Sequence, residues 1–130
     1  MTQENMDPSF VGEGIYKENI LDHYKNPHNK GEIENAEIKF TENNPLCGDI
    51  ITVNLKLNDQ KVEDIKFEGK GCAISIASAS LLTDKVKGMT IDEVMKLTKD
   101  EILEMLMIPI GPVRLKCALL CLETLQKAVI

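Results

Sequence analysis

The chain has 130 residues, of which 43% are hydrophobic and 28% charged, and this length and composition are those of one globular domain. Its net charge of −6 excludes non-specific binding to nucleic acid or to an anionic membrane surface. No apolar run approaches the roughly 20 residues of a membrane-spanning helix, and the first residues carry no secretory or transit signal. We therefore predict a cytoplasmic protein.

The first predicted elements are a tail, a helix and a strand. Residues 1–14 are polar and contain two glycines and a proline, which predicts a flexible tail before a single domain over residues 15–130. Apolar residues recur at helical spacing over residues 15–25, and Pro27 ends that helix. Weak alternation of apolar and polar residues over residues 36–41 predicts a strand.

A loop and two further strands follow. The sequence Asn-Pro-Leu-Cys-Gly-Asp at residues 44–49 is typical of a loop that connects strands. Clean alternation over residues 51–57 predicts a half-buried strand, and a turn at residues 58–60 leads to a strand over residues 62–67 that needs a bulge. The three strands are expected to form an antiparallel sheet.

The C-terminal half reads as helical. Residues 73–87 form a predicted helix rich in small side chains, which allow close packing on a sheet or a partner. Capping boxes that begin at Thr90 and Thr98 predict two short helices, and Pro112 suits the first position of a last helix over residues 113–129. The predicted fold class is therefore α+β, with helices packed on one face of a three-stranded antiparallel sheet.

Three of the four cysteines occupy special local positions. Cys47 lies in the loop between strands, Cys72 at the predicted start of a helix, and Cys117 in the first two turns of the last helix. Helix N-termini stabilise anions and lower the pKa of a thiol. Asp49 adds an oxygen donor two residues after Cys47, so the four residues could bind one metal. A cytoplasmic location favours metal binding over disulfides, because thiols stay reduced there.

Two basic residues support an anionic site. Arg114 and Lys116 lie near the start of the last helix, where cations are normally disfavoured, and a nearby anion would explain them. Three thiolates and a carboxylate suit zinc by geometry and an iron–sulfur cluster by their sulfur atoms. The alternative is that these cysteines are core residues, because free cysteine is often buried.

The remaining cysteine and the two histidines favour structural roles. Cys121 lies one helical turn after Cys117 among leucines, which is typical of a core residue. His23 and His28 could be metal ligands or catalytic bases. Neither has a recognisable partner nearby, so we predict solvated or packing roles for both.

Four segments together resemble the U-type iron–sulfur cluster scaffolds, the family of IscU, SufU and the NifU N-terminal domain. The matching segments are residues 22–27, 44–49, 69–80 and 112–117. The resemblance implies that Cys47, Asp49, Cys72 and Cys117 hold a 2Fe–2S cluster during its assembly, or a zinc ion in its absence. It also implies that sulfur arrives as persulfide from a cysteine desulfurase, with Cys117 as the acceptor. The cluster would then pass to apo-proteins or carriers, from a monomer or from a homodimer with a bridging cluster.

The chain departs from its relatives at the third motif. Lys116 stands where IscU proteins carry histidine, residues 110–114 replace their Leu-Pro-Pro-Val-Lys stretch, and the insertion usual in SufU is missing. Three hypotheses remain open at this point. The chain is a cluster scaffold without enzymatic activity, a zinc-dependent sulfur acceptor that acts as a sulfurtransferase, or a structural zinc domain that serves as an interaction module.

Overall fold

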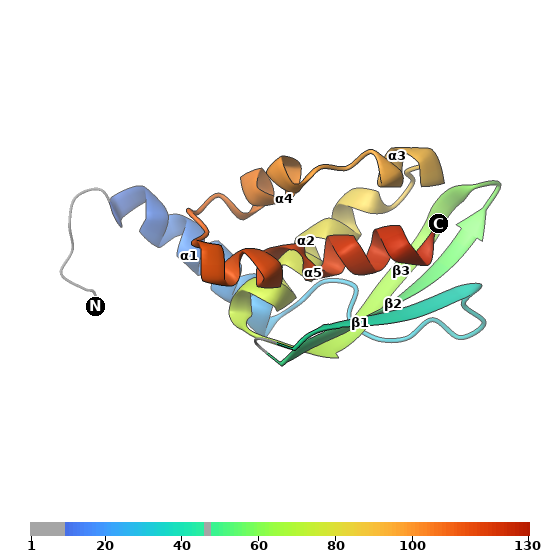
Figure 1. The fold of residues 1–130 in the computed structure, drawn as a ribbon, viewed down its shortest axis with the longest axis horizontal. Coiled ribbons are helices and arrows are strands. Elements are labelled where there is room, and N and C mark those ends of the chain that lie inside the picture. The colour runs from blue at the N-terminus through green and yellow to red at the C-terminus, as the bar shows by residue number, and fades with distance from the viewer. Residues whose placement is uncertain (1–9, 46–47) are drawn as a thin grey trace.

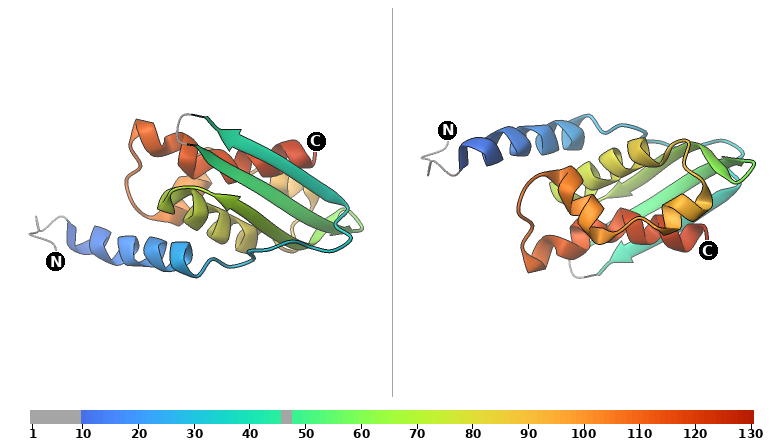
Figure 2. Two further views of the ribbon diagram at one scale, coloured as in Figure 1. Left: turned by 90° about the horizontal axis from the view of Figure 1, so that it is seen from below. Right: turned by 90° about the horizontal axis from the view of Figure 1, so that it is seen from above.

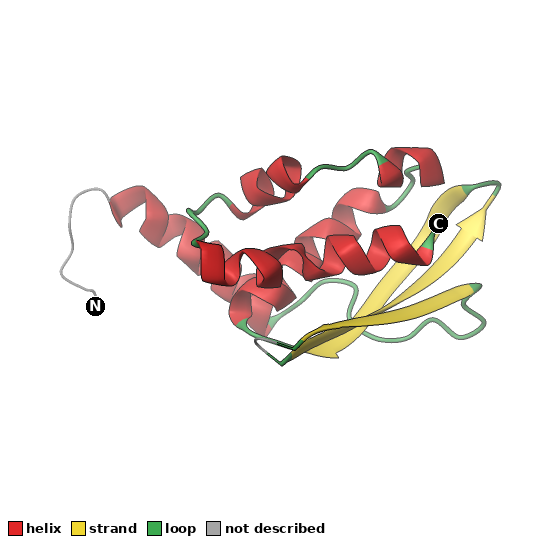
Figure 3. Ribbon diagram, in the orientation of Figure 1, coloured by secondary structure: helices red, strands yellow, loops and turns green. Residues whose placement is uncertain are grey.

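The computed structural model describes residues 10–45 and 48–130, and residues 1–9, 46 and 47 lie outside the described residues. Five helices and three strands follow one another along this part of the chain (Figures 1 and 3). They are α1 (Phe10–Lys25), β1 (Ile38–Asn44), β2 (Asp49–Asn58), β3 (Lys61–Lys70), α2 (Ala73–Val86), α3 (Ile91–Met95), α4 (Lys99–Leu106) and α5 (Pro112–Ala128).

The sheet is antiparallel throughout, with the strand order β1-β2-β3. Asp59 and Gln60 connect β2 to β3, and both have positive φ, 54° and 67°, as the tight turn of a two-residue hairpin requires. The register shifts opposite Leu57, where Glu63 is the extra residue of β3. The predicted turn and the predicted bulge are both confirmed.

The core lies between one face of the sheet and the helices α2 and α5, which pack on it side by side (Figure 2). Ile51, Val53 and Leu55 alternate along β2 and point into this core, fully buried. Leucines and valines of the helices complete the cluster. The α+β fold, with helices on one face of a three-stranded antiparallel sheet, is confirmed.

The small side chains of α2 allow it to lie in the middle of the helical layer. Every residue from Ser75 to Ser80 is buried, because α2 contacts α1 on one side, α5 on another and β3 beneath it. Larger side chains at these positions would push the neighbouring helices apart. The close packing predicted from the sequence is therefore observed.

The two short helices α3 and α4 form an outer layer over α2 and α5. Thr90 caps α3 and Thr98 caps α4, each in a complete capping box with the glutamate three residues later. The side-chain amide of Gln126 in α5 donates to the carbonyl oxygens of Val94 and Leu97, at 3.1 and 3.0 Å. These bonds hold α3 and the residues that follow it against α5. Both predicted capping boxes are confirmed.

Several element boundaries differ from the sequence prediction. Helix α1 already begins at Phe10, five residues before the predicted start, and ends at Lys25 as expected. Strand β1 runs on to Asn44 and β2 starts at Asp49, so the ladder reaches into the predicted loop. In the described part of the chain, no helix combines the length and hydropathy needed to cross a membrane.

Candidate metal centre

Three of the predicted ligand residues meet at one end of the sheet. The β1–β2 hairpin, the junction of β3 with α2 and the start of α5 all lie at this end, on the left in Figure 1. One donor atom each of Asp49, Cys72 and Cys117 can be chosen so that all lie within 4.8 Å of one another. The fourth predicted ligand, Cys47, lies outside the described residues. Asn44, three residues before Cys47, donates a hydrogen bond to Cys117, and Asp49 itself follows Cys47 by two residues.

Asp49 is the first residue of β2 and pairs with Asn44, the last residue of β1. The expectation that it lies in a loop is therefore wrong, because the ladder continues to this pair. Its carboxylate is only 1% exposed and bonds to the start of α2. The backbone N–H of Cys72 donates to Oδ1 at 3.1 Å, and the hydroxyl of Ser75 donates to Oδ2 at 2.7 Å.

Cys72 is the residue that precedes the first turn of α2, as predicted, and it is half-buried. Burial acts to raise the pKa of its thiol, but hydrogen bonds from Ser75 and Cys117 outweigh burial and hold that pKa below the ordinary value of 9.0. The direction agrees with the sequence prediction. The largest lowering cause is the hydrogen bond from the backbone N–H of Ser75 in the first turn of α2, which is the helix-start effect that the sequence predicts.

Cys117 lies in the second turn of α5 and is 1% exposed. The side-chain amide of Asn44 donates a hydrogen bond to its Sγ at 3.9 Å. The residue therefore faces the β1–β2 hairpin as well as α2. None of the described cysteines, Cys72, Cys117 and Cys121, forms a disulfide, which agrees with the preference for metal or thiol chemistry.

Gly71 leaves the space that lets Asp49 and α2 approach each other. A Cβ atom at this position would lie 3.0 Å from Asp49 Oδ1 and 3.0 Å from the Cβ of Ser75. Both distances are shorter than an ordinary contact, so a side chain here would displace the carboxylate or the helix. Gly71, the second glycine of the Gly-Lys-Gly-Cys sequence, thus has a structural function at the site.

The donor set suits a soft or borderline metal. Tetrahedral zinc with Zn–S bonds of about 2.3 Å places its ligand atoms about 3.8 Å apart, so donors already within 4.8 Å need only a small contraction. Two thiols and a carboxylate also fit the thiolate-rich ligation of iron–sulfur clusters. With Cys47 as a fourth donor, the chain could surround one zinc ion or a two-iron cluster.

The two predicted auxiliary cations lie beside the site and remain exposed. Arg114 and Lys116 belong to the first turns of α5, and within the described residues neither forms an ion pair. Lys116 lines a hollow of about 140 Å³ together with Asn44, the residue that donates to Cys117. Their role toward a bound anion stays a prediction.

Cys121 is a core residue, as predicted. It is 1% exposed within the main hydrophobic cluster, and burial raises the pKa of its thiol to about 12.

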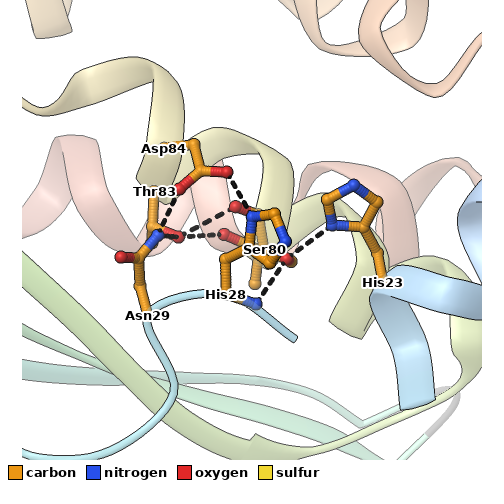
Figure 4. Close-up of polar contacts among 7 residues, drawn as sticks. His23, His28, Asn29, Ser80, Thr83 and Asp84 are labelled. Atoms are coloured by element: carbon orange, nitrogen blue, oxygen red, sulfur yellow. Dashed lines mark hydrogen bonds and ion pairs between the residues drawn. The ribbon is translucent and has the colours of Figure 1, made fainter. Parts of the chain in front are cut away.

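Both histidines have partners, contrary to the sequence prediction (Figure 4). His23 is buried between α1 and α2, and its Nδ1 lies 2.7 Å from Ser80 Oγ. His28 donates its backbone N–H to the same Oγ at 2.8 Å, and its Nδ1 lies 2.5 Å from Asp84 Oδ2. Asn29 donates to Thr83 and Asp84 beside them. These bonds fasten α1 and the following loop onto α2, so the packing role predicted for His23 is correct.

The contact of α1 with α2 should weaken in acid through His23. Burial, and then the nearby His28, lower the pKa of His23 below its ordinary 6.5. The unfolded chain therefore binds a proton at a higher pH than the folded chain, and the free energy of unfolding should fall as the pH drops below 6.5. Denaturant unfolding measured above and below pH 6.5 tests this.

His23→Asn is the matched variant for this measurement, because its side-chain amide can still reach Ser80 and does not titrate. It should reduce the loss of stability in that pH window. An unchanged pH dependence in the variant would show that His23 is not the responsible group.

Sequence reasoning missed two residues of the metal centre, Ser75 and Asn44. Ser75 lies in a run of small residues that reads as helix packing, and nothing in that pattern separates it from Ser78 or Ser80. Asn44 belongs to the loop motif, and the motif alone gives it no role. The spacing Cys72 to Ser75 was the one available signal, because a residue three positions into a helix faces back toward its start.

Comparisons with known proteins place the chain among similar domains. A family model described as the NifU-like N terminal domain matches residues 15–130. The iron-sulfur cluster assembly scaffold protein IscU 1 of Archaeoglobus fulgidus is 39% identical over 116 residues, which cover 89% of this chain and 75% of that protein. The zinc-dependent sulfurtransferase SufU of Bacillus subtilis is 42% identical over 132 residues, which cover 88% of this chain and 89% of that protein.

A solved structure is similar as well. A protein from Fervidobacterium islandicum, described as an iron-sulfur cluster assembly scaffold for the SUF system, matches with a TM-score of 0.79 and 33% identity. The match covers 90% of this chain and 98% of that one.

Proposed function

The chain belongs to the family of NifU-like N-terminal domains, and from this premise we propose that it is a scaffold for iron–sulfur cluster assembly. A 2Fe–2S cluster would be built on it from iron and desulfurase-derived sulfur and then transferred to apo-proteins or carriers. The observation that carries this proposal is the approach of Asp49, Cys72 and Cys117 to within 4.8 Å at one end of the fold.

The ligand set suits a cargo that must be held and then released. The thiolates of Cys47, Cys72 and Cys117 would bind iron firmly, because soft sulfur ligands suit iron–sulfur clusters. Asp49 would supply a single hard oxygen donor, and it would be the ligand that exchanges most easily. Its two carboxylate oxygens accept hydrogen bonds from the Cys72 N–H and the Ser75 hydroxyl at the start of α2. In the absence of a cluster, the same residues would bind zinc.

Anaerobic reconstitution tests the proposal. The purified chain is incubated with iron, cysteine and a cysteine desulfurase, and its absorption spectrum is measured together with its metal and sulfide content. A stable visible-absorbing cluster supports the scaffold. The ratio of clusters to chains shows whether the cluster lies in a monomer or bridges a homodimer. The homodimer and the cytoplasmic location both stay predictions.

Two other results would contradict the scaffold. Zinc-only binding combined with strong stimulation of the desulfurase would indicate a zinc-dependent sulfur acceptor, the activity named for the Bacillus subtilis relative. Zinc-only binding without any sulfur transfer, together with unfolding on metal removal, would indicate a structural zinc domain.

Sulfur delivery should modify Cys117 and leave Cys121 unmodified. Persulfide formation needs a thiolate, and burial in the main core raises the pKa of the Cys121 thiol to about 12. Cys117 is equally buried but lies at the candidate metal centre, beside Asn44 and the other donor residues. Mass spectrometry of peptides after incubation with a desulfurase and cysteine measures the site of the added sulfur. Cys121→Ala should accept as much sulfur as the wild type, whereas Cys117→Ala should accept far less. Sulfur found on Cys121 would contradict this prediction.

A further inference from the structure

The hydroxyl of Ser75 contacts each of the three described donor residues of the candidate metal centre. Its Oγ lies 2.7 Å from Asp49 Oδ2, 3.2 Å from the carbonyl oxygen of Cys117 and 3.8 Å from Cys72 Sγ. Ser75 is 1% exposed and belongs to the first turn of α2. A single buried hydroxyl therefore joins the start of β2, the start of α2 and the second turn of α5.

The Ser75 hydroxyl can donate only one hydrogen, and this limits which of its neighbours can accept it. A serine hydroxyl donates one hydrogen, whereas the Asp49 carboxylate and the Cys117 carbonyl can only accept. The shorter distance and the charged acceptor both favour donation to Asp49. Ser75 thus acts mainly on the carboxylate.

The start of α2 depends on Asp49 in return. The first turn of α2 contains no acidic residue. Asp49 supplies the missing acceptor from β2, with one oxygen on the Cys72 N–H and the other on the Ser75 hydroxyl. With both oxygens bound, the carboxylate has one orientation relative to the two cysteines.

We propose that Ser75 is a positioning residue that orients Asp49 as a metal ligand. The inference rests on the proposed function in that it takes Asp49 as a ligand of the cargo or of zinc. Hydrogen-bonding partners of ligating carboxylates typically contribute about 10–100-fold to metal affinity. Ser75 fills that role here, and the Cys72 N–H holds the second oxygen.

Ser78 offers a matched control. It is buried in the same helix, one turn after Ser75, and its hydroxyl donates to the carbonyl oxygen of Ala118 at 2.6 Å. Ser75 makes the corresponding contact with the neighbouring carbonyl of Cys117. Ser78→Ala therefore removes a comparable hydrogen bond between α2 and α5, and that bond involves none of the donor residues.

The experiment measures Zn²⁺ affinity of the full chain by competition with a colorimetric chelator. Ser75→Ala should bind Zn²⁺ about 10–100-fold more weakly than the wild type. Ser78→Ala should differ from the wild type by less than about twofold, as expected for an independent site. Equal affinities of the two serine variants would overturn the proposal.

A double-mutant cycle separates positioning from a general structural effect. If Ser75 acts through Asp49, adding Ser75→Ala to an Asp49→Ala chain should leave the Zn²⁺ affinity unchanged. The visible ligand-field bands of the Co²⁺-loaded protein should also shift in Ser75→Ala toward those of Asp49→Ala. A further loss of affinity in the double variant, or Co²⁺ bands like those of the wild type in Ser75→Ala, would overturn the proposal.

A second pair of variants decides the matter if Ser75→Ala does not fold. Threonine and valine have the same shape and differ only in the hydroxyl, so Ser75→Thr should retain more Zn²⁺ affinity than Ser75→Val. Equal affinities of that pair would overturn the inference. None of these readouts needs a cluster, so they can fail while reconstitution succeeds, or succeed while the scaffold proposal fails.

Discussion

Asp49→Ala should slow the transfer of a reconstituted cluster to a recipient apo-protein by roughly tenfold, the effect of about 1.4 kcal/mol on the barrier. Three thiolates and a carboxylate around a two-iron cluster carry excess negative charge, and removing one carboxylate lowers the repulsion among the remaining ligands. The variant also lacks a carboxylate whose oxygens can bond to the Cys72 N–H and the Ser75 hydroxyl once they no longer bind iron. Both effects should slow the release of the cluster.

The measurement follows the visible absorption of the cluster while it passes to an excess of recipient protein. Asp49→Asn is the informative companion, because it removes the charge and keeps an oxygen donor. If repulsion dominates, the asparagine variant should release its cluster as slowly as the alanine variant. Transfer by Asp49→Ala at the wild-type rate would show that the carboxylate is not the exchangeable ligand.

Gly69→Ala should lower the free energy of unfolding by about 3 kcal/mol, or the Tm by about 10 °C for a domain of this size. Gly69 has φ of +152°, a conformation that residues with a side chain rarely adopt. An added Cβ would also lie 2.0 Å from the carbonyl oxygen of Ile50 on the neighbouring strand. The strand pairing next to the metal centre would have to separate to accommodate it.

Gly111→Ala is the matched control for this prediction. Gly111 has φ of −72°, and an added Cβ would meet no atom within 4 Å. Its substitution at the start of α5 should cost less than about 1 kcal/mol. Denaturant unfolding of the metal-free proteins compares the two variants, and equal losses would contradict the steric argument for Gly69.

The fold could be predicted from the sequence largely because local signals agreed with the final packing. Alternation in β2, the Asp59–Gln60 turn and the capping boxes at Thr90 and Thr98 each act within a few residues, and all of them are observed. The boundaries at Asn44 and Asp49 were missed because pairing between strands, rather than local preference, extends the ladder to them.

The candidate site was predicted in part for the same reason. Asp49, Cys72 and Cys117 are chemically conspicuous residues at element ends, and the structure brings them together. The role of Ser75 was missed because its partner Asp49 is 26 positions away, and the partner of His23 was missed because Ser80 is 57 positions away. Contacts over such separations depend on how α1, α2 and β2 are assembled in three dimensions, which periodicity does not encode.

The burial of Cys117 beside Asn44 affects how the metal-free protein responds to oxidants. Oxidation of cysteine to sulfenic acid follows thiolate character and exposure. Of the three described cysteines, Cys72 is the one that is partly exposed and has a lowered pKa, whereas Cys117 and Cys121 are each 1% exposed. Among these three, peroxide should therefore oxidise Cys72 before Cys117, so that a predicted metal ligand is lost before the proposed sulfur acceptor.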